Sequence, residues 1–342
     1  MAQHASSSPG TSSSSPGTSS SPSAPSSAGA SPGAPGACPR RRRTRLTDGP
    51  LPILAAAVLW GTTGTAGSMA PSGAPAPAIG AASLALGGLL LLLTTRGAWR
   101  LFTAATGAEQ RLLAVGALAV AGYPLTFYPA VARTGAAVAA VIALGSAPVF
   151  TGLLAWATGQ ARPTARWAVA TLAAVTGCAV LVLGPQLTGG PAHMDTVGIA
   201  LAALAGLSYA VYSLLGGRLI GRGHPSAAVM GAMFGAAGLL VLPVLLATGT
   251  AWLATVRGAA VALHLAVLPT FLAYRLFGHG LRHTPASVAT TLTLAEAAVA
   301  ALLGITVLGE RLPVVSWCGL AVLSLGLALL TVPGRPGRRG SR

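Results

Sequence analysis

Ten apolar segments of about twenty residues each, separated by short polar or Gly/Pro-containing breaks, run through this sequence from residue 51 to residue 332. Each is as long as a helix must be to cross the ~30 Å hydrocarbon core of a bilayer. Only 8% of the residues are charged and the mean hydropathy is +0.71, whereas a soluble domain carries about 25% charged residues. The sequence therefore predicts an all-α integral membrane protein. The expected spans are 51–69, 76–95, 112–132, 135–157, 164–184, 197–217, 226–247, 259–281, 285–308 and 314–332.

The placement of the arginines predicts the orientation of these spans. With the N-terminus inside, seventeen arginines fall on the inner side and three on the outer side, while Arg275 lies within the eighth span. This bias follows the positive-inside rule, so we expect both termini in the cytoplasm and a multi-pass protein of the cell membrane. The net charge of +16 then reflects topology and attraction to anionic lipid, and a nucleic-acid partner is not expected.

The composition divides the chain into four parts. Residues 1–49 consist mostly of Ser, Pro, Gly and Ala and end in an arginine cluster, and residues 333–342 form a short basic tail. Because the first segment has almost nothing to bury, we expect it to be a disordered cytoplasmic tail. The apolar region between the tails divides into a first five-helix repeat, 50–185, and a second one, 196–332.

Motifs of enzymes are missing from the sequence. There is no lysine, and therefore no nucleotide-binding glycine loop with its lysine, and both aspartates, Asp48 and Asp195, lie outside the spans. The three cysteines have no metal-ligand spacing. We therefore expect neither an enzyme nor an ATP-driven pump, and no cofactor or metal ion.

The two halves of the chain resemble each other. A shift of 150 residues aligns the fourth span with the ninth, and because each half has five spans, an odd number, the second half is inserted upside down. Inverted repeats of this kind are typical of transporters, whose substrate site lies at the midplane between the halves. The aligned pairs include Thr134 with Thr284, Leu144 with Leu294, Gly159 with Gly309, Pro163 with Pro313 and Trp167 with Trp317.

A family resemblance rests on three of these features. They are Trp60-Gly61 midway along the first span, the five-plus-five repeat, and the sequence LAEAAVAALLGITVLGERL in the ninth span. Over residues 50–332 the chain resembles the EamA family of the drug/metabolite transporter superfamily. The resemblance implies ten helices as two inverted repeats, an exporter of metabolites or drugs, and cytoplasmic termini.

The ninth span departs from the family pattern at one position. In the family this span often reads Leu-x-Glu-Pro, then small and apolar residues, then Leu-Gly-Glu. This chain keeps Glu296 and the later Leu-Gly-Glu but has Ala297 where the proline usually stands. A helix break beside Glu296 therefore lacks its usual cause, although Pro148 lies one residue from the equivalent point in the first half.

Glu296 is the foremost candidate for a functional residue. At ~1.5 Å rise per residue it lies ~18 Å along the helix from Thr284, near the midplane of the bilayer. A carboxylate there is costly unless it faces a cavity, finds a partner or binds a proton. It could exchange a proton, or it could contact a cationic or amine-bearing substrate. The alternative is a protonated carboxyl that hydrogen-bonds to Thr291 or Thr293 only to fix packing.

Four other residues complete the candidate set for substrate or proton binding. Arg275 could extend to the cytoplasmic interface or, pointing inward, could pair with Glu296 or hold a substrate carboxylate. Trp60 and Tyr123 could form aromatic walls of a cavity, and Pro148 marks the equivalent of Glu296 in the first repeat. Trp60 and Tyr209 stand 149 residues apart, close to the repeat shift, so they are expected to face each other.

These observations leave three hypotheses. The first is a secondary transporter that exports small organic, amino-acid-like metabolites or drugs by alternating access, with a proton exchanged at Glu296. The second is an importer or exchanger of amino acids or nucleotide sugars on the same fold, and the third is a membrane scaffold without transport. The lipid bilayer, a small-molecule substrate and protons are the expected partners, and glycine-lined faces such as Gly231-xxx-Gly235 also allow a homodimer.

Overall fold

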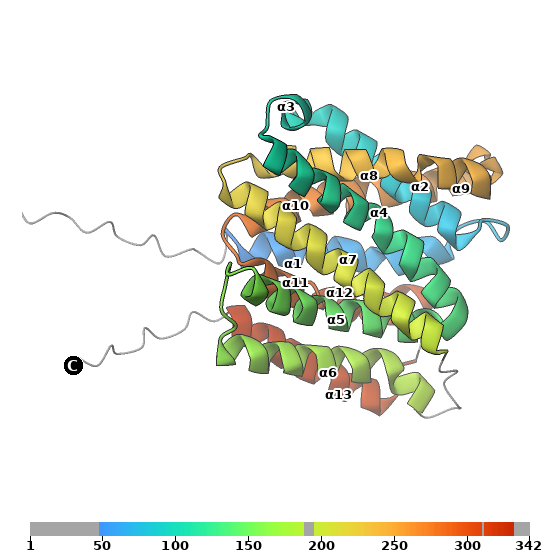
Figure 1. Ribbon diagram of the computed structural model, residues 1–342. Coiled ribbons are helices and arrows are strands. Elements are labelled where there is room, and N and C mark those ends of the chain that lie inside the picture. Colours follow the sequence, from blue (N-terminus) through green and yellow to red (C-terminus); the bar gives the residue numbers. More distant parts are fainter. Residues whose placement is uncertain (1–47, 188–194, 310, 332–342) are drawn as a thin grey trace, which may run out of the picture. The chain divides into compact units, whose positions relative to one another are not determined.

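A computed structural model describes residues 48–187, 195–309 and 311–331. The expected tail 1–49, apart from residues 48 and 49, and the basic tail 333–342 lie outside this range. Within it the chain forms a bundle of helices (Figure 1). They are α1 Pro50–Ser68, α2 Ala76–Thr94, α3 Ala98–Thr103, α4 Gly107–Thr134, α5 Ala136–Ala157, α6 Ala165–Leu187, α7 Thr196–Gly221, α8 Ser226–Thr248, the 3₁₀ turn η1 Ala251–Ala254, α9 Val256–Leu265, the π-helical η2 Ala266–Leu272, α10 Ala273–Leu281, α11 Ala286–Leu292, α12 Ala295–Leu308 and α13 Val314–Thr331.

The helices match the ten expected spans. Nine helical segments of the described chain are long and apolar enough to cross a membrane, with α9, η2 and α10 counted as one and α11 and α12 as another. The tenth is α1, which has 19 residues but carries a Gly- and Thr-rich sequence in its second half. The short break expected near Arg133 is formed by Gly135, whose φ of 83° favours glycine.

The eighth span contains a π-helical segment because a proline stands in its middle. Pro269 has no N–H and cannot donate to the carbonyl of Leu265, four residues earlier. Ser83 of α2 takes over that acceptor, since its hydroxyl lies 3.0 Å from the Leu265 oxygen, and it also contacts the hydroxyl of Thr270 at 2.8 Å. The irregular turn is therefore tied to α2 by hydrogen bonds.

The ninth span is interrupted without a proline, which corrects the expectation drawn from Ala297. Helix α11 ends at Leu292 and α12 begins at Ala295, and the turn between them is tightened by i→i+3 bonds such as Glu296 N–H to the Thr293 oxygen at 3.0 Å. Threonine hydroxyls supply the cause. Those of Thr290, Thr291 and Thr293 each bond to a carbonyl three or four residues earlier, a competition that bends helices.

Helix packing follows the inverted repeat. Helix α6 packs on α13 and α2 on α8, so the fifth span meets the tenth and the second meets the seventh. The contact of α5 with α7 has its counterpart in that of α12 with α1, and the contact of α4 with α7 has its counterpart in that of α1 with α10. In Figure 1 the paired helices α6 and α13 lie side by side. The same interfaces thus occur twice, once in each half.

Glycine faces serve contacts inside the chain. A Cβ on Gly231 of α8 would lie 3.0 Å from the Leu91 carbonyl oxygen of α2, and one on Gly238 would lie 3.0 Å from the Leu84 oxygen. These positions let the backbones of the second and seventh spans approach closely. The Gly231-xxx-Gly235 face, which could have served a homodimer, is therefore occupied by α2.

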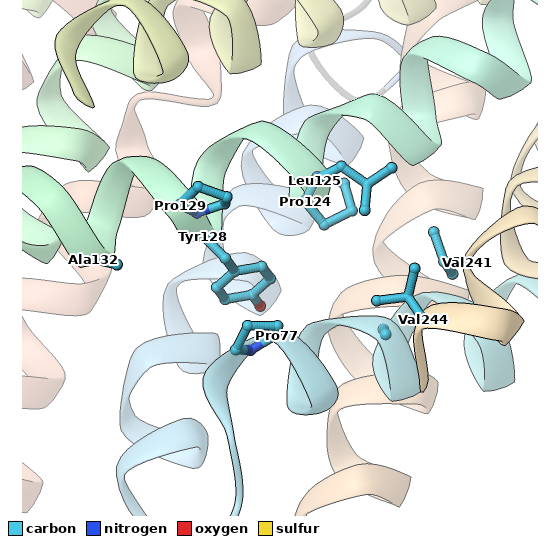
Figure 2. A pocket seen from close by; sticks show the side chains of 9 residues that line it. Pro77, Pro124, Leu125, Tyr128, Pro129, Ala132, Val241 and Val244 are labelled. Atoms are coloured by element: carbon cyan, nitrogen blue, oxygen red, sulfur yellow. The ribbon is translucent and has the colours of Figure 1, made fainter. Parts of the chain in front are cut away.

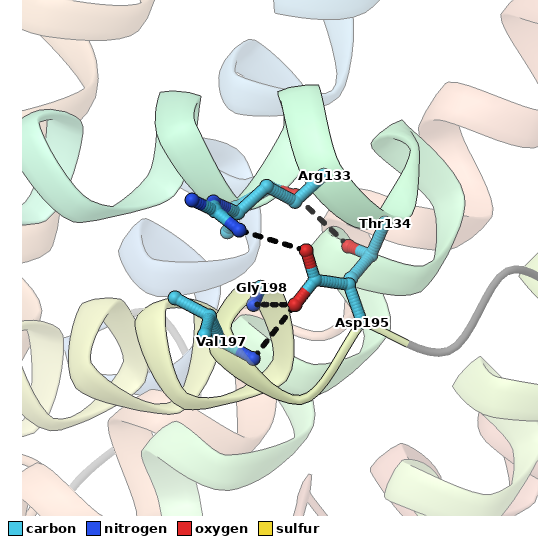
Figure 3. Close-up of polar contacts among 6 residues, drawn as sticks. Arg133, Thr134, Asp195, Val197 and Gly198 are labelled. Carbon is cyan, nitrogen blue, oxygen red and sulfur yellow. Dashed lines mark hydrogen bonds and ion pairs between the residues drawn. The ribbon is translucent and has the colours of Figure 1, made fainter.

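An ion pair joins the halves at the end of the bundle where α4 finishes and α7 begins (Figure 3). Arg133 donates to Asp195 at 2.9 Å, and the other Asp195 oxygen accepts from the backbone N–H groups of Val197 and Gly198. Asp195 therefore caps α7. The Arg133 guanidinium, helped by these two N–H groups, holds the pKa of the Asp195 carboxyl below its usual value.

Candidate functional site

Glu296 lies in the first turn of α12, directly after the tight turn at Thr293 and Leu294. The N-terminus of a helix carries a partial positive charge, so this position favours a carboxylate. The side chain is half-buried and forms no hydrogen bond or ion pair with any residue of the described chain. Its backbone abuts α1, where a Cβ on Gly61 would lie 3.1 Å from the Glu296 carbonyl oxygen.

The hydroxyls that could have fixed Glu296 for packing alone are bonded elsewhere. Thr291 donates to the Ser287 oxygen and contacts the Thr171 hydroxyl at 2.9 Å. Thr293 donates to the Thr290 oxygen at 2.9 Å and accepts from another helix. Neither therefore holds the carboxyl, which remains available for a ligand.

An aromatic cluster surrounds this point, and Trp60 of α1 is at its centre. Its ring centroid lies 4.9 Å from that of Tyr274, 5.5 Å from Phe277 and 6.4 Å from Tyr209, the last in an edge-on arrangement. Its indole N–H donates to the carbonyl oxygen of Pro269 at 2.7 Å. The π-helical turn of the eighth span thus fixes the ring, and Trp60 and Tyr209 meet as their spacing suggested.

Tyr123 of α4 joins the same cluster from the other side. Its ring is 6.4 Å from that of Tyr209, whose hydroxyl donates to Thr293 at 2.8 Å, in the turn that precedes Glu296. Aromatic side chains from both halves of the chain therefore meet beside the turn that carries Glu296.

Of the remaining candidates, Arg275 lies apart from this cluster and Pro148 lies within a neighbouring helix. Arg275 is exposed on α10, and its guanidinium carbon lies 5.4 Å from the ring centroid of Phe271, one turn earlier. It neither pairs with Glu296 nor extends toward the end of its helix, because helical side chains lean toward the N-terminus and the ring attracts the cation. Pro148 is buried inside α5, which packs on α7 and α11.

Sequence reasoning favoured Trp60 and Tyr123 and underrated three residues of the site. Tyr209 could have been chosen from its 149-residue spacing to Trp60. Tyr274 was visible only as one of many aromatic residues within the spans. Thr293 is expected from the sequence only as a hydrogen-bond partner of Glu296, whereas in the structure it links Tyr209 to the turn beside Glu296 through a bond between two distant helices.

Helix α1 is buried before Trp60 and more exposed after it. Ile53, Ala56 and Ala57, before Trp60, are fully buried. One turn after Trp60 on the same helix face, Gly64 is exposed, and a Cβ added to it would meet nothing within 4 Å; the same holds at Gly67. Open space therefore begins directly beyond the aromatic cluster, toward the end of α1.

The stretch of α7 that corresponds to this part of α1 in the second repeat is buried after its aromatic residue, Tyr209. The residues that follow Tyr209, including Tyr212, Ser213, Leu214 and Gly216, are buried. Because the repeat is inverted, residues after Tyr209 run toward the end of the bundle from which α1 starts. The stretch of α1 after Trp60 is thus less covered than the related stretch of α7 after Tyr209.

The fold and the site together define a class of protein. Membrane-spanning helices arranged as two inverted five-helix repeats, with a carboxylate and aromatic rings where the halves meet, are typical of membrane transporters. The chain belongs to the EamA-like transporter family, whose profile matches residues 48–183 and again residues 196–332.

Individual relatives agree with this assignment. The chain is 36% identical over 283 residues to the uncharacterised transporter YwfM of Bacillus subtilis (strain 168), which covers 83% of this chain and 93% of the relative. It is 30% identical over 293 residues to the threonine/homoserine exporter RhtA of Salmonella typhimurium (strain SL1344), covering 84% and 94%. A protein of known crystal structure shares the fold, with a TM-score of 0.66 and 18% identity over 82% of this chain and 96% of that one. The protein is thus a multi-pass membrane transporter, and these named relatives are transporters and not enzymes.

Proposed function

We propose that this protein is a secondary active transporter of the cell membrane that exports small, amine-bearing organic molecules of amino-acid size by alternating access. Glu296 binds the ammonium group of the substrate when it is ionised and a proton when the substrate has left. Trp60, Tyr123, Tyr209 and Tyr274 form the walls of the site. Both termini lie in the cytoplasm, as the arginine distribution predicts.

The observation that carries the proposal is a carboxylate at membrane depth whose oxygens no described residue binds. Such a group is retained at a cost in stability unless it has a ligand. An ammonium ion satisfies a carboxylate by charge and hydrogen bonds, and the faces of aromatic rings attract the same cation. The four aromatic walls and Glu296 therefore suit one chemical group.

Proton exchange follows from the same arrangement. An apolar surrounding favours the neutral form of a carboxyl group, whereas a bound ammonium favours the charged form. Substrate and proton therefore compete for Glu296, which couples the exit of one to the entry of the other. The export of threonine and homoserine by the relatives named RhtA supports this substrate class and this direction.

Proteoliposomes with an imposed pH gradient test the proposal. The purified protein should take up radiolabelled threonine or homoserine when the gradient drives protons outward through it, and Glu296→Gln should reduce this uptake at least tenfold. Asp195→Asn, which changes an acid at the bundle end, is the matched control and should leave transport unchanged. Transport by Glu296→Gln with the rate and pH dependence of the unchanged protein would refute the role of this residue. Accumulation with the opposite sign would identify an importer.

Thiol accessibility tests the alternation. In a background with Cys38, Cys178 and Cys318 replaced, Thr63→Cys places a thiol in the less covered stretch of α1 after Trp60, and Ser213→Cys places one in the buried half of α7. A membrane-impermeant maleimide should modify the thiol at position 63 in the resting protein. It should modify the thiol at position 213 only during transport and from the opposite side. Equal modification of both positions in the resting protein would contradict the asymmetry.

A further inference from the structure

A pocket of ≈ 200 Å³ lies away from the central cluster, between α2, α4 and α8 (Figure 2). All but one of the side chains around it are wholly apolar. Its mouth is on the outer surface of the bundle, where Leu125 is 50% exposed. The residues that line it are Pro77, Ala81, Pro124, Leu125, Tyr128, Pro129, Ala132, Val241 and Val244.

The pocket lies in the half of the bundle where α2 begins and α4 and α8 end. Pro77 is the second residue of α2, Ala132 precedes the end of α4 by two residues, and Val244 precedes the end of α8 by four. These three helix ends lie on the same side of the bundle, at the right of Figure 1. Pro124, ten residues before the end of α4, also lines the pocket, so at ~1.5 Å per residue the pocket extends from about 2 Å to about 15 Å below the helix ends.

Tyr128 supplies the single polar atom that side chains bring to the pocket. Its ring lies against Gly80, where any side chain would collide with it, so the tyrosine spans the interface of α4 with α2. In Figure 2 its hydroxyl points toward Pro77. The hydroxyl has no hydrogen-bond partner among the residues that the structure describes. An unpaired hydroxyl in an apolar surrounding costs free energy unless a ligand supplies an acceptor.

We propose that this pocket binds one acyl chain of a glycerophospholipid from the surrounding leaflet, with the ester carbonyl of that chain accepting a hydrogen bond from Tyr128. The pocket is continuous with the lipid-facing surface, so acyl chains are the molecules that reach it. An apolar cavity of about 150 Å³ accommodates benzene, so this one has room for several methylene groups. Ester carbonyls of the lipid lie at the boundary of the hydrocarbon layer, and the Tyr128 hydroxyl points toward Pro77 in the first turn of α2, the helix end near which that boundary is expected.

A photoreactive lipid provides the test. The full-length protein is placed in nanodiscs of diester phosphatidylcholine that contain a fraction of the same lipid with a diazirine in its acyl chain, and crosslinked peptides are mapped by mass spectrometry. Crosslinks should concentrate on Leu125 over the comparably exposed Leu118. Val244→Phe should plug the mouth and lower the yield at Leu125 at least fivefold. Leu240→Phe, one turn earlier on the exposed face of α8, should leave it unchanged.

The hydroxyl is tested separately from the cavity. In competition, diester lipid should displace the probe about fivefold better than diether lipid, because one neutral hydrogen bond is worth about that factor. Tyr128→Phe should retain the crosslinks and lose this preference. Uniform labelling of all exposed leucines, or an unchanged yield in Val244→Phe, would overturn the site. Displacement of the probe by excess threonine would also overturn it, because the occupant would then be a transported molecule.

Discussion

Gly61 separates α1 from α12 at the level of Glu296, and its substitution by alanine tests the packing that positions the carboxylate. A Cβ at position 61 would lie 2.6 Å from Cβ and 2.7 Å from Cγ1 of Val299, and 3.1 Å from the Glu296 carbonyl oxygen. All three distances are shorter than ordinary contacts between carbon or oxygen atoms. Because one neighbour is backbone and the other a β-branched side chain, the helices must move apart.

The magnitude follows from two opposing effects. Replacing glycine by alanine inside a helix gains about 0.5–1 kcal/mol, whereas inserting a methyl group into a packed interface costs about 1–3 kcal/mol. Gly61→Ala should therefore be close to neutral or lose up to about 2.5 kcal/mol. Gly64→Ala is the matched control on the same helix, because its new Cβ meets nothing within 4 Å. Gly64→Ala should therefore keep the full gain in stability of about 0.5–1 kcal/mol.

Thermal unfolding in detergent, followed by tryptophan fluorescence, measures the comparison. The unfolding midpoint should rise for Gly64→Ala, and the midpoint of Gly61→Ala should lie below that of Gly64→Ala. Only Gly61→Ala should impair transport. Adding Val299→Ala to Gly61→Ala removes the two closest contacts and should recover part of both losses. If the two alanine variants unfold at the same temperature, or if Val299→Ala deepens the defect, the close approach of α1 and α12 at this point is refuted.

Three further predictions follow from single contacts. Trp60→Phe removes the donor to the η2 carbonyl and should cost about 1–3 kcal/mol of stability, measured as the thermal midpoint, with weaker substrate binding. Tyr209→Phe removes the bond to Thr293 and should cost about 0.5–1.5 kcal/mol, while Km for the substrate rises. Because pairing with Arg133 lowers the pKa of Asp195, its contribution to stability should persist above the ordinary aspartate pKa of about 3.9 and be lost as the pH falls through the lowered value. Asp195→Asn should remove this part of the pH dependence in thermal scans.

Most of the fold could be predicted because membrane insertion depends on simple quantities. Span length, apolarity and the side on which arginines fall are local properties of the sequence, and they give the helices to within a few residues for most spans. The expected span 112–132 is longer in the structure, since α4 begins at Gly107 and ends at Thr134. Its first turn is capped by Thr106 and Glu109, a polar extension that a search for apolar residues does not detect.

The irregular helix turns could not be predicted as well. A proline within a span predicts an irregular helix turn, and Pro269 lies in the π-helical turn of the eighth span. The turn before Glu296 has no proline and depends on whether threonine hydroxyls bond to their own helix or to a neighbour. Thr293 does both, with the Thr290 oxygen and with Tyr209. That choice is made by tertiary contacts, so the absence of a proline at position 297 does not decide whether the helix breaks.

The direction of side chains limited the prediction of the site in the same way. Glu296, Trp60 and Tyr123 converge, but Arg275, which a count of ionisable residues within spans selects equally well, lies over Phe271 on the exposed face of α10. Arg275 and the buried Phe277 lie on different faces of α10. The sequence alone does not reveal which of these faces is covered by the neighbouring helices. Among the described residues, the proposed site therefore contains one acidic side chain and no arginine, and a zwitterionic substrate would find a partner there for its ammonium group only.

The repeat gives the proposed alternating access a structural basis. The halves share interfaces such as α5 with α7 and α12 with α1, so each half can adopt the arrangement of the other without new kinds of contact. In the present arrangement the stretch of α1 after Trp60 is uncovered, and the related stretch of α7 after Tyr209 is buried. Exchanging these two arrangements would bury the first stretch and uncover the second, and the aromatic rings would then face the other side of the membrane.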